Sequence, residues 1–178
     1  MAKARNVLSN PELIAYSKEH VRYEVWMLVE CVNLLSRRPF ETESEVVATL
    51  LRNTVTESFA IHLRNLVDFL YPGTHVKPTD VLADDFFPQG KRPAAFPAIP
   101  SKLQAARERA HKQVSHLTTG RLNPGDPGKE LRGELVIETL NVLVEFVRQA
   151  SPNKLDRSVI DYVLELQRAL DGQPLGRH

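Results

Sequence analysis

Twelve prolines are distributed along this 178-residue chain so that long segments contain none of them. A proline inside an α-helix removes a hydrogen bond and clashes with the preceding turn, at a cost of about 3 kcal/mol. Helices are therefore expected between the prolines. Where prolines gather, over 87–100, we expect a proline-rich connector whose apolar Phe87, Phe96 and Ile99 pack on the rest of the domain.

Apolar residues recur at intervals of three and four in each long segment, which is the period of a helix with one buried face. Capping boxes are expected at Thr42–Glu45 and Ser101–Gln104, because a hydroxyl residue precedes Glu or Gln by three positions. Tyr23 and Trp26 are expected to anchor the first helix in the core or in a helix–helix interface. The predicted helices cover about 11–37, 42–71, 80–86, 101–119, 131–150 and 155–170.

No segment alternates polar and apolar residues over the length of a strand. The predicted fold class is therefore all-α, an antiparallel helical bundle of about five long helices and one short helix. A chain of this length suits a single domain over 1–178, with flexible ends at 1–10 and 172–178.

Composition limits the classes of function. There is no apolar run near the ~20 residues of a membrane span, and no secretory signal, so we expect a cytoplasmic protein without membrane contact. The single Cys31 excludes an intrachain disulfide and is expected to be a small packed hydrophobe. A net charge of +1 argues against nucleic-acid binding through bulk charge.

The neutral total conceals two segments of opposite charge. Residues 41–87 hold three basic and eight acidic residues, a net charge of −5, whereas 101–121 hold five basic residues and one acidic, a net charge of +4. A local basic stripe can bind a phosphate where the whole molecule would not. The opposite charges of the two segments could equally hold one helix against the other.

The predicted second helix carries a dense polar cluster. Glu57, Arg64 and Asp68 are seven and eleven residues apart and therefore form one stripe, while His62 lies on another face and Asn65 follows Arg64. One interpretation is an ion-pair ladder that holds Arg64 beside another helix. The other is a polar groove that orients catalytic groups opposite the stripe.

A second cluster lies on the predicted helix over 101–119. Arg109 and His116 are seven residues apart and share a face, and His111 and Lys112 lie between them. An arginine can hold a phosphate with two hydrogen bonds, and a histidine beside a cation has a lowered proton affinity, which suits proton exchange near neutral pH. The alternative is a solvated basic face near the end of a helix.

Metal and serine chemistry are not supported by the spacing. His111 and His116 are five residues apart, about 140° around a helix, so they do not converge as the i, i+4 pair of a zinc helix does. Ser58 and Ser115 have no nucleophile elbow or oxyanion context. We therefore expect no metal and no cofactor.

The segment from Arg109 to Thr118, with its Arg-x6-His arrangement late in a helical bundle, resembles the HEPN superfamily, in particular its abortive-infection branches. The segment Glu57–Phe69, which reads Glu-Ser-Phe-x-x-His-x-Arg-Asn-x-x-Asp-Phe, also looks like a group of bacterial HEPN-like proteins. The motifs cover about 42–121, and the helical layout covers the whole chain.

The resemblance implies a helical bundle that forms a homodimer, with two Arg/His motifs meeting in a cleft. Active members are metal-independent ribonucleases of toxin or phage-defence type, and others bind only nucleotides or protein partners. Arg109 would then polarise the scissile phosphate and His116 would act as general acid or base, with Lys112 adding phosphate affinity. The implied partners are RNA or a nucleotide and an antitoxin-like protein. The alternative is a non-catalytic interaction or nucleotide-binding module in which the same polar residues form a structural ion-pair network.

Overall fold

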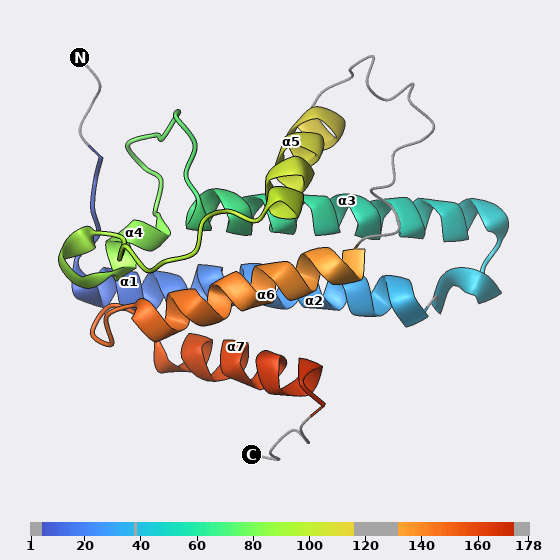
Figure 1. Cartoon of the computed structure of the whole chain (residues 1–178). Helices are drawn as coiled ribbons and strands as arrows, with labels where there is room; N and C mark the ends of the chain where they lie inside the picture. Colours follow the sequence, from blue (N-terminus) through green and yellow to red (C-terminus); the bar gives the residue numbers. More distant parts are fainter. Residues whose placement is uncertain (1–4, 38, 116–131, 173–178) are drawn as a thin grey trace.

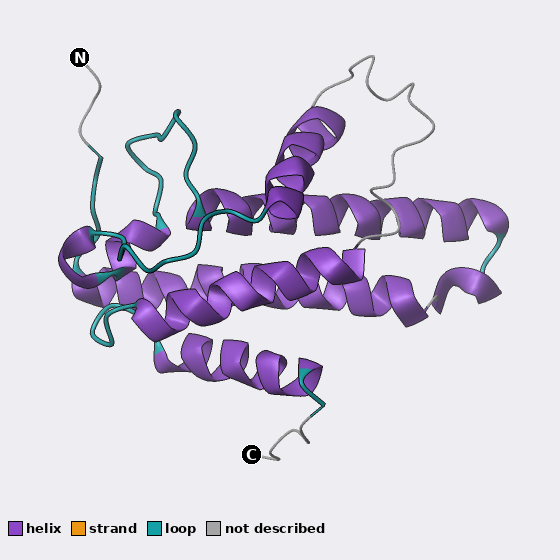
Figure 2. Ribbon diagram, in the orientation of Figure 1, coloured by secondary structure: helices purple, strands orange, loops and turns teal. Residues whose placement is uncertain are grey.

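The computed structural model describes residues 5–37, 39–115 and 132–172, and all the regular structure in these ranges is helical (Figure 2). This confirms the predicted all-α helical bundle. The helices are α1 (Asn10–Tyr16), α2 (Arg22–Arg37), α3 (Glu45–Leu70), α4 (Ala83–Phe86), α5 (Ser101–Ser115), α6 (Arg132–Gln149) and α7 (Arg157–Leu170), with a π-helical turn at Ser17–Val21 and 3₁₀ turns at Pro39–Thr42 and Pro88–Gly90.

Helices α2 and α3 form an antiparallel pair that runs the length of the molecule (Figure 1). Helix α6 packs on this pair, and α7 packs on α6 and α2. Helix α5 crosses α3 steeply and contacts both α3 and α6. The C-terminal half of α3 is therefore the place where the first helices, α5 and the segment that follows α3 come together.

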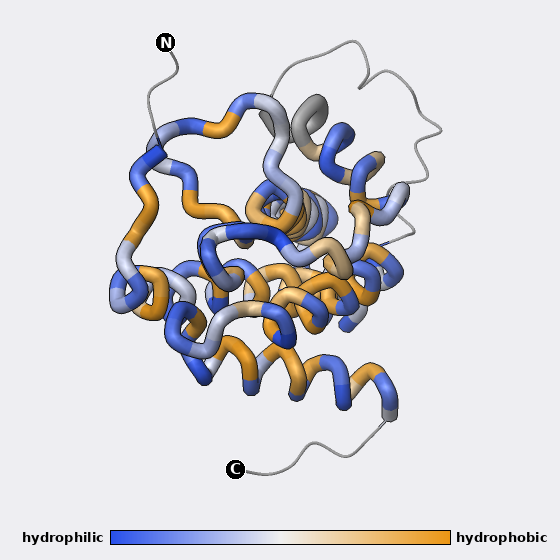
Figure 3. The backbone as a smooth tube through the Cα atoms, turned by 60° about the vertical axis from the view of Figure 1, so that its left-hand side comes forward, coloured by the Kyte–Doolittle hydropathy of each residue, from blue (hydrophilic) through white to orange (hydrophobic). Residues whose placement is uncertain are grey.

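The apolar faces of the helices point toward one another inside the bundle (Figure 3). At one end of the bundle the core is an aromatic cluster of Phe69, Phe86, Phe87 and Phe146, with edge-to-face ring contacts of 5.3–5.9 Å. Three of these rings are fully buried, and Phe69 is partly buried. The cluster joins α3, α4 and α6, and it lies directly beneath the end of α3 that carries the polar residues.

The first predicted helix, 11–37, is interrupted by a π-helical turn at Ser17–Val21. Ser17 is fully buried; its hydroxyl donates to the carbonyl of Ile14 at 2.8 Å and accepts from the backbone N–H of Asp156 at 3.0 Å. These bonds fix the wider turn against the start of α7. Apolar periodicity alone could not reveal the turn, because its cause is a contact with a segment 139 residues away.

Two helix starts differ from the predicted capping boxes. Thr42 belongs to a 3₁₀ turn that follows Pro39, so Ser44 precedes the first residue of α3. Ser101 is itself the first residue of α5, because the carbonyl of Pro100 accepts the backbone N–H of Gln104 at 3.0 Å. A 3₁₀ turn that begins at Pro39 thus lies before α3, and Pro100 directly precedes α5.

The short predicted helix 80–86 is confined to α4, because the Asp85 carboxylate accepts the backbone N–H of Leu82 at 2.9 Å and thereby caps the helix there. Tyr23 and Trp26 are 48% and 46% exposed, so neither lies in the core. Of the two expected positions, Tyr23 takes the helix–helix interface, because its ring contacts His62 of α3 edge-on. Cys31 is buried, as predicted.

The proline-rich connector packs on the domain as predicted, with Phe87 and Phe96 buried. Arg92 organises it: its guanidinium lies over the rings of Phe96 and Tyr71, at 4.8 and 5.3 Å from their centroids, and it donates to the carbonyl of Leu70. A cation at the C-terminal end of a helix is favourable, because the last carbonyls carry partial negative charge. The connector thus covers the end of α3.

Replacement of Asp156 by alanine should lower the free energy of unfolding by about 1 kcal/mol at pH 7. Asp156 caps α7 by accepting the backbone N–H of Ser158 at 2.9 Å, and the Ser158 hydroxyl, which also donates to it, holds the pKa of this carboxyl below its usual range. Because the pKa of Asp156 is lower in the folded protein than in the unfolded chain, its charged carboxylate stabilises the fold at pH values above the unfolded-state pKa. This contribution is lost as the pH falls through the folded-state pKa. The difference from the unmodified protein should therefore shrink below about pH 4.

Thermal or urea unfolding at pH 7 and pH 3 measures this difference. The exposed Asp161→Ala, on the same helix, is the control and should change stability by less than about 0.5 kcal/mol. An Asp156→Ala effect of the same size at both pH values would contradict the capping role.

Candidate functional site

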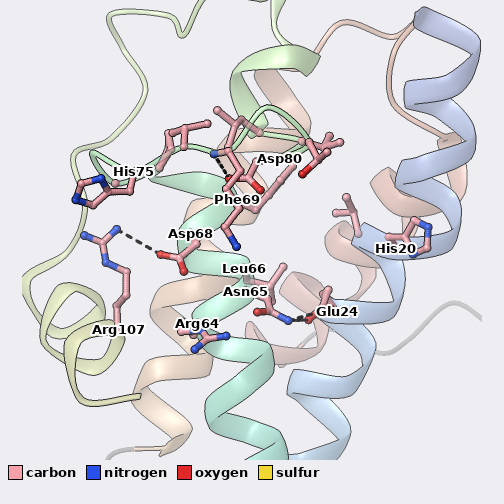
Figure 4. Close-up of a pocket in the computed structure, with 18 of the residues that line it drawn as sticks. His20, Glu24, Arg64, Asn65, Leu66, Asp68, Phe69, His75, Asp80 and Arg107 are labelled. Atoms are coloured by element: carbon pink, nitrogen blue, oxygen red, sulfur yellow. Dashed lines mark hydrogen bonds and ion pairs between the residues drawn. The ribbon is translucent and has the colours of Figure 1, made fainter. Parts of the chain in front are cut away.

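A groove of about 1040 Å³ lies over the C-terminal half of α3 (Figure 4). Four parts of the chain form it: the end of α1 with its π turn and the start of α2, the floor from α3, the segment 72–82, and α5. This volume suits a ligand of the size of a nucleotide. Its polar lining residues are Tyr16, His20, Glu24, Arg64, Asn65, Asp68, Thr74, His75, Lys77, Thr79, Asp80, Arg107 and Glu108.

The floor of the groove comes from the predicted polar segment of α3. Arg64, Asn65 and Asp68 line it, while Leu66 beside them is buried and ties the floor to the core. The alternation arises from helical geometry, because one face of α3 packs on the bundle and the next face is open to the groove. The sequence motif is therefore presented as a rigid surface.

One wall is formed by Tyr16, His20 and Glu24, which follow one another at intervals of four residues through the π turn. The rings of Tyr16 and His20 lie 4.7 Å apart between centroids. Burial raises the pKa of the Tyr16 phenol, and the charges of Glu24 and Asp80 add to this effect. Tyr16 is consequently a neutral hydroxyl at physiological pH.

Glu24 is held by two residues of α3. Its carboxylate lies 2.7 Å from Nδ1 of His62 and accepts from the side-chain amide of Asn65 at 3.3 Å. His62 is 8% exposed and sits behind Glu24, whereas the Glu24 side chain is 25% exposed at the groove. The predicted His62 and Asn65 thus share a partner and fix the orientation of a carboxylate that the groove presents.

The opposite wall is built from the segment 72–82 and is tied to the beginning of the chain. The backbone N–H of Asn6 donates to the carbonyl of Pro78 at 2.9 Å, and Arg5 donates to the carbonyl of Asp80 at 3.1 Å. Arg5 also forms a bidentate ion pair with the buried Asp85. Residues 5–9 were expected to belong to a flexible end, and these bonds instead connect Arg5 and Asn6 to the groove wall.

Arg107 of α5 closes the groove over the end of α3. It donates to the carbonyl of Tyr71 at 2.7 Å and to the side chain of Gln104 at 3.0 Å, and it lies 3.7 Å from the carboxylate of Asp68. Asp68 and Arg107 point toward each other in Figure 4, with His75 beside Arg107. This pair joins the acidic segment to the basic one, as the opposite charges of the two segments allowed.

The predicted site residues are distributed as follows. Arg64, Asn65 and Asp68 line the groove, His62 supports it from behind, and Glu57 is exposed on α3, outside the described lining. Arg109 is half-buried on α5, where Arg107 and Glu108 are the described residues that face the groove. His111 and Lys112 belong to α5, and His116 lies outside the residues that the structure describes.

Sequence reasoning missed Tyr16, His20, Glu24 and Arg107. The first three depend on the π turn, which turns this face of the helix toward α3 and has no local sequence signal. Arg107 lies in the same basic run as Arg109, and the positions of the buried Leu103 and Ala106 would have placed it next to the packed face.

Within the described ranges no group of three or more His, Cys, Asp or Glu residues is arranged to hold a metal ion. None of the helices described is long and apolar enough to cross a membrane. Comparisons of this chain with protein-family models, with curated proteins and with solved structures find no match. Its function is therefore inferred from the residues of the groove and of α5.

Proposed function

We propose that this protein is a metal-independent ribonuclease of HEPN type, with Arg109 and His116 as the catalytic pair and the groove as the binding site for the adjoining part of the RNA. One observation carries the proposal. The two segments that resemble the superfamily, Glu57–Phe69 and the stretch that begins at Arg109, come from helices that meet at a single groove. The helices that carry both segments therefore border one site, with Arg107 and Glu108 of α5 in its lining.

The groove offers groups that a strand of RNA can contact, beside the four carboxylates that also line it. Arg64, Lys77 and Arg107 supply cationic groups for phosphates, and Tyr16 and His20 supply rings on which a base can stack. Arg109 follows Glu108 directly along α5. Because a helix with its side chains is only about 10–12 Å across, a strand bound in the groove can pass round α5 to the face that carries Arg109.

The reaction needs no metal ion. The 2′-hydroxyl oxygen of one ribose attacks the adjacent phosphorus, a new P–O2′ bond forms, and the P–O5′ bond breaks to leave a 2′,3′-cyclic phosphate. His116 makes one of the two proton transfers, from the 2′-hydroxyl or to the leaving 5′-oxygen, and a water molecule makes the other. Arg109 stabilises the negative charge on the phosphate oxygens. In this proposal the protein acts as a homodimer in the cytoplasm, in toxin or phage defence, and an antitoxin-like protein is its regulator.

The test is cleavage of a labelled single-stranded RNA in the presence of EDTA. We expect cleavage by the unmodified protein and a loss of about 100-fold or more in rate for Arg109→Ala and for His116→Ala. Arg148→Ala, which removes an exposed arginine of α6, is the matched control and should retain full activity. Intact RNA after incubation with folded, unmodified protein would refute the proposed activity.

A non-catalytic binding module is the second candidate, and the polar bonding favours it. His62 and Asn65 both hydrogen-bond to the Glu24 carboxylate. Arg107 lies among three acceptors, which belong to Tyr71, Gln104 and Asp68. Such fixed networks are typical of structural sites as well as of binding sites. This candidate predicts that the protein binds RNA or a nucleotide in the same assay without cleaving it, and that His116→Ala lowers the melting temperature.

A further inference from the structure

The groove contains a carboxylate that the proposed cleavage chemistry does not use. Glu24 comes from the first helices, while the proposed catalytic residues come from α5. A carboxylate has about four acceptor positions. His62 contacts Oε2, and the Asn65 amide is shared between the two oxygens at 3.3 Å from each, so acceptor capacity remains on a side chain that is a quarter exposed at the groove. Glu24 is thus a fixed acceptor with capacity to spare.

Two aromatic residues lie beside Glu24. His20 and Tyr16 lie one and two helical turns before it on the same wall, and their rings are in contact at an angle of 52°. A base that stacks on the exposed His20 ring, against which Tyr16 packs, would turn an edge toward the Glu24 carboxylate. Unpaired bases in RNA are commonly bound in this way, by stacking on aromatic side chains and by hydrogen bonds to their Watson–Crick edges.

The four bases differ in what they offer to a carboxylate. Guanine has two adjacent donors, N1–H and the N2 amino group, which match the two oxygens of a carboxylate. Adenine and cytosine each place a ring-nitrogen acceptor next to their amino group, and uracil places carbonyl oxygens on both sides of its single N–H. An acceptor facing Glu24 would be repelled, so the fixed carboxylate favours guanine and opposes the others.

The cationic groups lie on other parts of the same groove. Arg64 comes from the floor, Lys77 from the segment 72–82 and Arg107 from α5. His20 and Glu24 lie across the groove from Arg107 (Figure 4). This separation suits one nucleotide, with its base on the wall of the first helices and its phosphate toward α5. A ligand with only a phosphate would leave the carboxylate side unused.

From this arrangement we propose that the groove selects guanine in single-stranded RNA, with Glu24 accepting hydrogen bonds from N1–H and N2–H, His20 stacking on the base and Tyr16 packing against the His20 ring. The inference rests on the proposed function in that it takes RNA as the ligand, and it adds a base preference. His62 and Asn65 are positioning residues in this scheme, because they act through Glu24.

The experiment measures equilibrium binding of two fluorescent pentanucleotides, UUGUU and UUUUU, in EDTA. Both carry 2′-O-methyl groups, so that neither can be cleaved. We expect the unmodified protein to bind UUGUU about tenfold more tightly, a ratio that follows from a pair of hydrogen bonds to one base edge. Glu24→Gln should remove this preference, because a carboxamide offers a donor in place of one acceptor. The affinity for UUUUU should not fall, since the carboxylate opposes uracil.

Glu19→Gln is the matched control, since Glu19 is an exposed residue of the π turn that lies outside the described lining of the groove. It should keep the tenfold preference. A second variant, His20→Ala, should weaken UUGUU binding while leaving the melting temperature unchanged, because His20 is exposed.

Three results would overturn the inference: equal binding of both pentanucleotides, binding of neither, or a preference that survives Glu24→Gln. The outcomes remain separate from those of the cleavage test. Cleavage of RNA by a protein with no guanine preference refutes the inference and leaves the ribonuclease standing. A guanine preference in a protein that leaves RNA intact refutes the ribonuclease and leaves the inference standing.

Discussion

Phe146→Ala should lower the free energy of unfolding by about 3–5 kcal/mol, because it removes the central ring of the aromatic cluster. Phe146 is fully buried and contacts the rings of Phe69, Phe86 and Phe87 at 5.3, 5.7 and 5.9 Å between centroids. The loss combines the transfer energy of a large apolar side chain with the cavity that remains, since three surrounding rings on rigid elements cannot collapse into it. Urea unfolding monitored by circular dichroism measures this change.

The loss of packing in Phe146→Ala should also loosen the groove, because Phe69 both lines the groove and contacts Phe146 directly. The matched control is Ile137→Ala on the same helix, where the side chain is 44% exposed and the expected loss is below about 1 kcal/mol. Equal losses for the two variants would show that the aromatic cluster is not the main support of this end of the bundle.

Arg5→Ala should lower the free energy of unfolding by about 3 kcal/mol, because it breaks an ion pair with a buried carboxylate. Its guanidinium pairs with both oxygens of Asp85, which is 4% exposed. This hydrogen-bonded pairing raises the pKa of the Arg5 guanidinium. Removal of the arginine leaves a carboxylate buried without its counter-charge. An uncompensated buried charge lowers the free energy of unfolding far more than the loss of a surface ion pair does.

A double-mutant cycle separates the pair from its surroundings. Arg5→Ala with Asp85→Ala should be less destabilised than the sum of the single variants, because the second change removes the stranded charge. Asp171→Ala, at the exposed end of α7, is the surface control. Additive losses in the cycle would contradict the pairing. Hydrogen exchange should also rise in the segment 78–85 of Arg5→Ala, since Arg5 fixes the carbonyl of Asp80.

The regular parts of the fold could be predicted because they depend on local rules. Proline positions and apolar periodicity located all the long helices of the described chain to within a few residues. The departures have tertiary causes. Ser17 bonds to the start of α7 and stabilises a π turn, and Asp85, held by Arg5, caps α4 three residues after the predicted helix start.

The candidate site was predictable in part. Arg64, Asn65 and Asp68 share one face of α3, and that face became the floor of the groove. Their partners could not be read from spacing. Glu24 meets Asn65 across 41 positions of the chain, and Arg107 meets Asp68 across two different helices. A one-dimensional pattern shows which residues share a helix face, but it does not say which face of another helix will lie opposite.

The sequence alone determined that this chain is an all-α bundle with an acidic segment over 41–87 and a basic segment over 101–121, because helix formation and burial follow from residue type and a period of 3.6. The tertiary structure decided that these helices cross at the end of α3, that a π turn brings Tyr16, His20 and Glu24 to the same place, and that Arg107 pairs with Asp68. The physical reason is range: periodicity acts over a few residues, whereas a groove forms from surfaces that only packing brings together.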